Sequence, residues 1–201
     1  MVDASLYRSP FEGHALGERP ALDGSVGVRI RAGLVPSAVL VSTWVSGEAG
    51  LQAALSHLLG QTPPGPTGQT LATRLGMLMR TGPEEWLLIS DGTSDACAVL
   101  RAAIGADVGG VTDLSHARCC MNVQGPRCLD ALSKLFALDC RTDAFPVGEL
   151  RLSGHHHLPC SLHRRGETEF DLYVFTTYAH DQLGSLLDAA LEYGVKLEGI
   201  R

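Results

Sequence analysis

One pattern recurs along the chain: two strand-like runs joined by a tight turn, followed by a segment whose apolar residues fall at helical spacing. The first copy turns at Gly82-Pro83, a dipeptide typical of tight turns. The expected elements are strands over Leu75–Arg80 and Trp86–Ser90 with a helix over Asp95–Ile104, and then strands over Leu158–Leu162 and Phe170–Phe175 with a helix over Ala179–Tyr193. Such units favour an α+β fold of mostly antiparallel sheets with helices packed on one side.

The remaining regular segments fit the same fold class. We expect further strands over Val26–Ile30, Val39–Val45 and Cys119–Val123, and helices over Leu51–Leu59 and Cys128–Phe136. Gly60 and Gly194 are plausible helix ends, Pro126 suits a first helical turn, and Thr176 or Thr177 could cap the last helix. The proline-rich segment 61–70 and the glycine-rich segment Gly105–Gly110 are both predicted to be loops.

The amino-terminal residues lack this regularity. Up to Pro20 they mix glycine, proline and polar residues without a period, so we predict an arm over residues 1–24 and a domain over residues 25–201. Such an arm would have few contacts with its own domain. Its apolar residues, Tyr7, Phe11 and Leu16, suggest that it lies extended against a partner and adds to the contact made by the apolar surface of the domain.

Composition and charge exclude several classes of function. Apolar residues make up 45% of the chain and charged residues 19%, as in a globular protein. The formal charge of −6 argues against nucleic acid or an anionic membrane as a partner. A bilayer-spanning segment and a secretory signal are both missing from the pattern. The six cysteines form no CxxC pair, which favours a reduced, cytoplasmic protein with buried thiols.

A run of possible metal ligands stands out in the last third. His155-His156-His157, Cys160 and His163 form the pattern HHHxxCxxH. On a single strand, His155, His157 and His163 would face one way while His156 and Cys160 face the other, whereas tetrahedral zinc needs converging ligands. We therefore favour an exposed polar start of a strand, with a place beside a partner's active-site entrance as the alternative.

Other catalytic constellations are incomplete. Neither GxGxxG nor GxxxxGK[ST] occurs, and there is no GxSxG elbow. Ser115 and His116 are sequence neighbours whose side chains would point apart on a strand, so Asp113 and His116 are better explained by turn chemistry. Glu84-Glu85 belongs to a turn. The sequence predicts no catalytic residue, no cofactor-binding residue and no metal ligand in this chain.

Three segments together resemble the γ subunit of heterotetrameric sarcosine oxidase. They are Gly82–Ile89 (GPEEWLLI); Val111–His116 (VTDLSH) with Gly125-Pro126-Arg127, Leu138-Asp139 and Phe145–Gly148 (FPVG); and Phe170–Val174 (FDLYV) with Ala189–Gly194 (AALEYG). The resemblance covers about residues 75–195. The parent fold that it implies is that of the aminomethyltransferase, or glycine-cleavage T-protein, group.

The resemblance implies a cytoplasmic complex of α, β, γ and δ subunits. Such a complex oxidatively demethylates sarcosine to glycine and generates hydrogen peroxide. With tetrahydrofolate present, the methyl carbon leaves as 5,10-methylenetetrahydrofolate. In the family the larger chains hold FAD, FMN and NAD, the δ chain holds zinc, and the folate site belongs to the α chain. In the family the γ chain is structural, in agreement with the lack of catalytic and nucleotide-binding motifs in this sequence.

The sequence departs from the family pattern at two places. The histidine run replaces an apolar strand near Gly154–Cys160, and the turn expected as Ser-Gly-Pro is Gln124-Gly125-Pro126. The alternatives are therefore a γ-type subunit of a demethylase for another N-methyl amine, a stand-alone folate-binding protein of the aminomethyltransferase type, and a metal-binding accessory protein built on the histidines.

Overall fold

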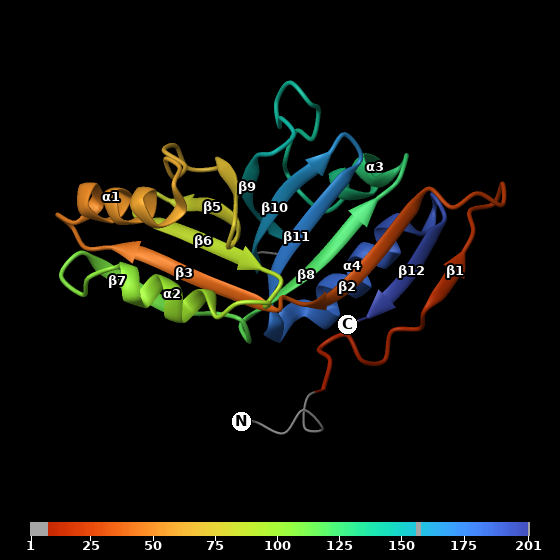
Figure 1. Cartoon of the computed structure of the whole chain (residues 1–201). Coiled ribbons are helices and arrows are strands. Elements are labelled where there is room, and N and C mark those ends of the chain that lie inside the picture. The colour runs from red at the N-terminus through yellow and green to blue at the C-terminus, as the bar shows by residue number, and fades with distance from the viewer. Residues whose placement is uncertain (1–7, 156–157, 201) are drawn as a thin grey trace. The chain divides into compact units, whose positions relative to one another are not determined.

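The computed structural model describes residues 8–155 and 158–200, and it divides into two compact units, each with its own sheet. The seven-stranded unit takes the described residues up to Leu34, then Ala117–Val147 and the described residues from Arg151 on. The five-stranded unit takes Val35–His116 and Gly148–Leu150. Figure 1 shows the elements of both units along the chain.

The five-stranded unit is an antiparallel sheet with two helices. Its strand order is β4-β5-β6-β3-β7, with β3 Ser37–Thr43, β4 Thr70–Thr73, β5 Gly76–Gly82, β6 Glu85–Ser90 and β7 Gly109–Asp113. Helices α1 (Glu48–Leu59) and α2 (Ala96–Ala103) bury Leu51, Leu55 and Leu100 in a core with Trp86. Helix α1 ends at Gly60, whose left-handed backbone (φ +68°) suits glycine best.

The seven-stranded unit has the order β1-β12-β2-β8-β11-β10-β9. Its strands are β1 Gly17–Arg19, β2 Val28–Leu34, β8 Arg118–Gln124, β9 Leu150–His155, β10 Leu158–Gly166, β11 Glu169–Phe175 and β12 Val195–Ile200. Strand β12 is parallel to β2, whereas the pairs β1–β12, β2–β8, β8–β11 and β10–β11 are antiparallel. Helices α3 (Cys128–Ser133) and α4 (Ala179–Leu191) share a core with one face of this sheet. These antiparallel-dominated sheets confirm the predicted α+β class.

The two units repeat one connectivity. Strand β3 begins the succession β3-α1-β4-β5-β6-α2-β7, and β8 begins the matching succession β8-α3-β9-β10-β11-α4-β12. The sheet orders match as well, except that the seven-stranded sheet has β2 inserted between β8 and β12 and β1 added beyond β12. Each central hairpin carries the pattern Arg-x-Gly-x-x-Glu-aromatic, at Arg80–Trp86 and at Arg164–Phe170, with a bulge after the arginine. The chain is therefore an internal repeat of one α+β unit.

In both hairpins the arginine is buried and holds the turn. The Arg80 Nε donates to the Gly82 carbonyl (3.1 Å), and the Arg164 Nε donates to the Gly166 carbonyl (3.1 Å). Each Nη2 also donates to the carbonyl three residues on, at Pro83 and at Glu167. Each guanidinium lies over the aromatic ring that ends the pattern, Trp86 or Phe170. The repeated sequence pattern thus encodes a repeated side-chain contact.

The amino-terminal segment makes more contacts with its own unit than the sequence predicts. Phe11 is fully buried in the core of the seven-stranded unit, and β1 pairs with β12 in the same sheet. The expectation of few internal contacts is therefore wrong for this part of the segment, because an isolated aromatic residue and three exposed strand residues give no periodicity. Tyr7 lies outside the described residues. The role of residues 1–24 as a partner-binding segment stays a prediction.

Several boundaries also differ from the sequence prediction. Helix α3 ends at Ser133, since the Leu132 carbonyl accepts from both Leu135 and Phe136 and tightens the chain there. Thr176 and Thr177 form a short 3₁₀ turn before α4, so neither caps the helix, and Pro126 precedes α3. Part of the predicted Gly105–Gly110 loop is the start of β7.

Candidate functional site

A group of polar and titratable side chains lies on the face of the seven-stranded sheet opposite its apolar core. His163, Asp171, Asn122 and Arg31 stand directly across from one another on β10, β11, β8 and β2. Residues paired in this way share one face of a sheet. The alternate residues of the same strands, such as Ile30, Met121 and Leu172, are buried in the core with α3 and α4. We call this group, together with Arg165, Tyr173 and Cys120, the polar row.

Asp171 is the centre of the polar row. Its carboxylate is buried and accepts hydrogen bonds from Asn122 Nδ2 (2.8 Å) and Arg165 Nη1 (2.9 Å). The Tyr173 hydroxyl donates to the same carboxylate at the longer distance of 3.5 Å. Asn122 Nδ2 also donates to Glu169 (3.0 Å). A buried carboxylate is stable when its charge is paired and its oxygens are hydrogen-bonded, and both conditions are met here.

The environment suppresses the reactivity of the neighbouring groups. Burial, followed by the charges of Cys120 and Asp171, raises the pKa of the Tyr173 hydroxyl above its ordinary range. Burial and the Asp171 charge raise the pKa of the half-buried Cys120 thiol well above its usual value. Burial lowers the pKa of His163, whose Nδ1 has no hydrogen-bond partner among the described residues. At neutral pH Tyr173, Cys120 and His163 are uncharged, and Asp171 is paired with Arg165.

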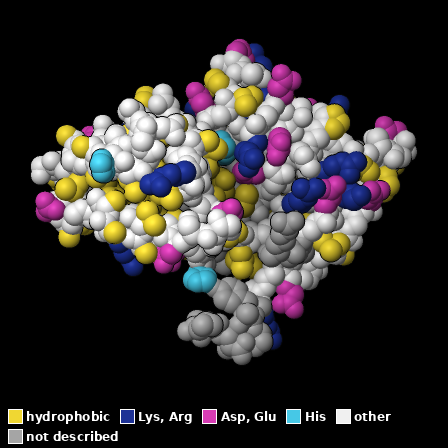
Figure 2. Space-filling model, in the orientation of Figure 1, with side chains coloured by type: hydrophobic (Ala, Val, Ile, Leu, Met, Phe, Trp, Pro, Cys, Tyr) yellow, Lys and Arg dark blue, Asp and Glu magenta, His cyan; other side chains and the backbone are white. Residues whose placement is uncertain are grey.

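This arrangement suits structure better than catalysis. A nucleophile needs an adjacent base or a lowered pKa. The Cys120 and Tyr173 pKa values are shifted in the opposite direction. Further along the same face, Glu198 pairs with Arg29 and with Arg31, both at 3.0 Å. Figure 2 shows basic and acidic side chains mixed on the surface of the seven-stranded unit. The face is charged but locally neutralised.

The histidine run does not form one strand. Strand β9 ends at His155 and β10 begins at Leu158, so the assumed single strand, and the facing of side chains derived from it, is wrong. His156 and His157 lie outside the described residues. His155, Cys160 and His163 are all buried, which contradicts an exposed polar strand start. Within residues 8–155 and 158–200, no three His, Cys, Asp or Glu side chains form a group that could hold a metal ion.

Asp113 ends β7 and His116 lies in the turn that follows, in agreement with the turn role predicted for these two residues. Asp113 Oδ1 accepts hydrogen bonds from the Ser115 backbone N–H (2.9 Å) and hydroxyl (2.6 Å), and these bonds lower the pKa of Asp113. The Ser115 hydroxyl oxygen accepts from the Ala38 N–H (3.1 Å), which ties this turn to β3. The Ser115 hydroxyl is thus engaged in structure. Glu84 and Glu85 are exposed at the β5–β6 hairpin, in agreement with a turn role.

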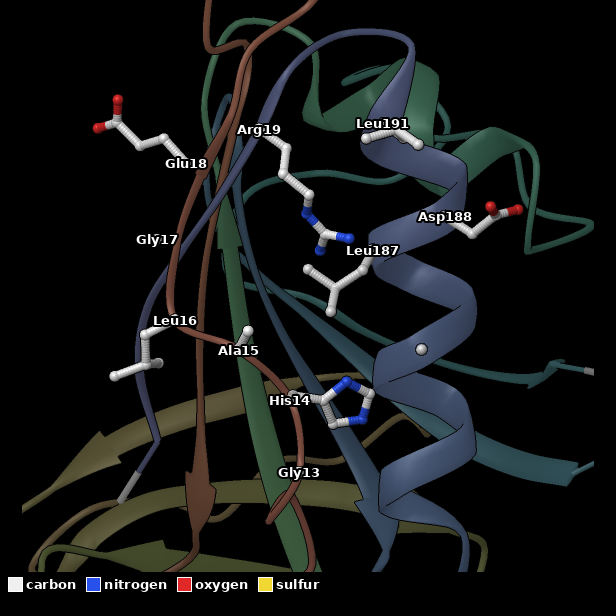
Figure 3. A pocket seen from close by; sticks show the side chains of 11 residues that line it. Gly13, His14, Ala15, Leu16, Gly17, Glu18, Arg19, Leu187, Asp188 and Leu191 are labelled. Atoms are coloured by element: carbon white, nitrogen blue, oxygen red, sulfur yellow. The ribbon is translucent and has the colours of Figure 1, made fainter.

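A pocket that sequence reasoning missed lies between residues 13–19 and α4. Its volume is about 370 Å³. Figure 3 shows Arg19 and Leu187 pointing into this space, whereas Glu18 and Asp188 point away from it. Glu18 is paired with Lys196 at 2.7 Å. The pocket could not be found from sequence, because one of its walls belongs to the segment predicted to be a free arm.

Among the residues that the structure describes, no helix is both long enough and apolar enough to cross a bilayer.

Comparison with known proteins decides the family. The model of the GCVT N-terminal domain matches residues 73–201, more than half of the chain. The chain belongs to the GCVT N-terminal domain family. Sarcosine oxidase subunit gamma from an Arthrobacter species is 29% identical over 190 residues, which cover 94% of this chain and 92% of the relative. The resemblance to this γ subunit group is thereby confirmed.

Solved structures agree with this membership of the GCVT N-terminal domain family. A chain of heterotetrameric sarcosine oxidase from Corynebacterium sp. U-96, solved with pyrrole 2-carboxylate, superposes with a TM-score of 0.76 at 25% identity. That match covers 94% of this chain and 96% of the other. The aminomethyltransferase T of Bartonella henselae superposes with a TM-score of 0.63 at 16% identity and shows the fold alone. The match covers 86% of this chain and 48% of the transferase.

Proposed function

We propose that this chain is the γ-type structural subunit of a heterotetrameric sarcosine oxidase-type complex. The observation that carries the proposal is the end-to-end match, in which more than nine tenths of both chains are covered in sequence and in structure. A domain shared with a larger enzyme would cover only part of the longer chain, as with the aminomethyltransferase, of which 48% is covered. The α, β and δ subunits are the proposed partners.

In this proposal the complex oxidatively demethylates sarcosine to glycine and generates hydrogen peroxide, and with tetrahydrofolate present the methyl carbon leaves as 5,10-methylenetetrahydrofolate. FAD, FMN, NAD and zinc are held by the other chains. This chain supplies neither a catalytic group nor a cofactor site, and the suppressed reactivity of the polar row supports that division of labour. Six free cysteines support a reducing, cytoplasmic setting.

Part of the amino-terminal segment is available for assembly. Phe11 is used in the core, but Leu16 remains 60% exposed beside the pocket in Figure 3. Arg19 points into this pocket, and its guanidinium suits an acidic side chain from another subunit. We therefore place one contact of the proposed assembly at residues 13–19, in place of the whole predicted arm.

The proposal is tested by omission. The α, β and δ chains of the complex are co-expressed with and without this chain, and sarcosine-dependent hydrogen peroxide formation is measured. We expect assembly and activity to fall without it, and the purified chain alone to be colourless and inert toward sarcosine. Saturable binding of tetrahydrofolate to the isolated chain would favour a folate-binding protein, and activity on another N-methyl amine would redirect the substrate assignment.

A further inference from the structure

Trp44 is an exposed tryptophan that follows β3 in the five-stranded unit. Its side chain is 51% exposed, and that of the next residue, Val45, is 97% exposed. The other tryptophan of the chain, Trp86, is fully buried. Scattered exposed apolar residues are ordinary on protein surfaces, so exposure alone says nothing about function. The distinguishing feature of Trp44 is how firmly it is held.

The indole is fixed at two places. Its Nε1 donates a hydrogen bond to the Ala106 carbonyl at 2.8 Å. Its six-membered ring lies against Gly110, where an added Cβ would stand 3.5 Å from Cη2 of Trp44. Both contacts are made to residues of the same unit. The ring therefore has one defined position although half of its surface faces solvent.

The backbone at Trp44 is equally constrained. The Trp44 N–H donates to the Val108 carbonyl (3.2 Å), and the Trp44 carbonyl accepts from the Gly47 N–H (2.8 Å) and the Thr43 hydroxyl (3.0 Å). Gly47 is required at this turn, because a Cβ there would stand 2.2 Å from the Val108 carbonyl oxygen. A contact residue that is already ordered loses little conformational entropy when it is covered.

The tip formed by Trp44, Val45, Ser46 and Gly47, here called the Trp44 tip, is uncharged and made mostly of small residues. Tryptophan is strongly enriched among residues that dominate binding energy at interfaces, where it fills a desolvated pocket. A membrane surface is a poor alternative, since the tip carries no lysine or arginine and the chain has a formal charge of −6.

We propose that the Trp44 tip is an assembly anchor that inserts into an apolar pocket of another subunit. The proposal rests on the proposed function, because it requires a complex into which this chain assembles. We expect the partner pocket to contact the exposed face of the indole and the Val45 methyl groups. The hydrogen bond from the indole N–H to the Ala106 carbonyl should remain in the complex.

The chain's two tryptophans provide a direct test. The chain is labelled with 5-fluorotryptophan, and the two fluorine resonances are assigned with the variant Trp44→Phe. On assembly with the partner chains we expect the Trp44 resonance to shift and to lose its sensitivity to exchange of H₂O for D₂O, while the Trp86 resonance stays in place. An unshifted Trp44 resonance in an assembled complex would overturn the proposal.

A variant series gives the second measurement. Trp44→Ser and Val45→Ser should each weaken assembly about tenfold or more, as for the loss of an interface anchor. Leu152→Ser is the matched control, since Leu152 is 50% exposed in the other unit, and we expect it to assemble normally. If the unaltered chain fails to assemble, the proposed function fails; if it assembles but the variants assemble equally well, only the Trp44 anchor fails.

Discussion

Replacing Arg164 with methionine tests whether the repeated hairpin arginine holds its unit together. The Arg164 side chain is 1% exposed and makes five hydrogen bonds. Two of them run from Nη1 to the carbonyls of Cys140 and Phe145, both at 2.8 Å and both buried. Nη2 also reaches the Thr142 hydroxyl (3.0 Å). The guanidinium therefore ties the segment after α3 to the β10–β11 hairpin.

The magnitude follows from the groups that methionine would leave unpaired. Each buried acceptor that loses its donor costs about 1–3 kcal/mol, and the carbonyls of Cys140 and Phe145 would both be left in this state. The acceptors at Gly166, Thr142 and Glu167 are partly buried and can regain water. We expect Arg164→Met to lower the free energy of unfolding by about 3–5 kcal/mol.

Urea unfolding of the purified chain measures this loss, and hydrogen exchange should show faster opening of residues 140–145. Arg31→Met is the control, because it makes the same substitution at an arginine whose side chain is 59% exposed and forms an ion pair with Glu198. Its expected cost is below about 1 kcal/mol. Equal costs for the two variants, or an Arg164 cost below about 1 kcal/mol, would show that the buried hydrogen bonds of Arg164 do not stabilise this unit.

Three further predictions concern the core, pH and thiols. Leu132→Ala should cost about 2–5 kcal/mol in urea unfolding, since Leu132 is fully buried on α3; a cost under about 1 kcal/mol would contradict this packing. The unfolding free energy should fall as pH drops through about 6.5, because His163 binds a proton in the unfolded chain but stays neutral when it is buried in the folded chain. His163→Gln should flatten the dependence of the unfolding free energy on pH, and an unchanged dependence would exclude His163 as its source. Burial raises the pKa values of Cys128 and Cys160 to about 11, so these native thiols should react slowly with a disulfide reagent at pH 8, unlike the unfolded chain; rapid native reaction would show them to be accessible.

Elements with a strong period were predictable. The alternation at Cys119, Met121 and Val123 predicts β8, and the spacing of Leu51, Leu55 and Leu59 predicts α1, because in both cases one face is buried and the other is not. Strands without this contrast between a buried and an exposed face could not be predicted from the sequence. β1 is exposed at all three residues, and β7 begins with two glycines. Gly109 is needed there because a Cβ would stand 2.3 Å from the Ser42 carbonyl, which is a tertiary constraint.

The polar row shows a similar limit. Asn122, His163 and Asp171 are far apart in sequence, and only the register of β8, β10 and β11 brings them together. The recurrence of two strands and a helix could be predicted, but its extension to β3, α1, β4 and β7 could not, because outside these segments the two copies share little sequence. The turn at Asp113 was found from sequence because its hydrogen bonds are local.

We propose that this chain is a structural member of a flavoprotein complex. The most direct measurement is affinity purification of the tagged chain co-expressed with untagged α, β and δ chains, followed by determination of the native mass and the flavin content. We expect recovery of all four chains in equal amounts, with flavin bound and with sarcosine oxidised. Recovery of the tagged chain alone, colourless and without partners, under conditions in which the other chains assemble and turn over sarcosine, would contradict it.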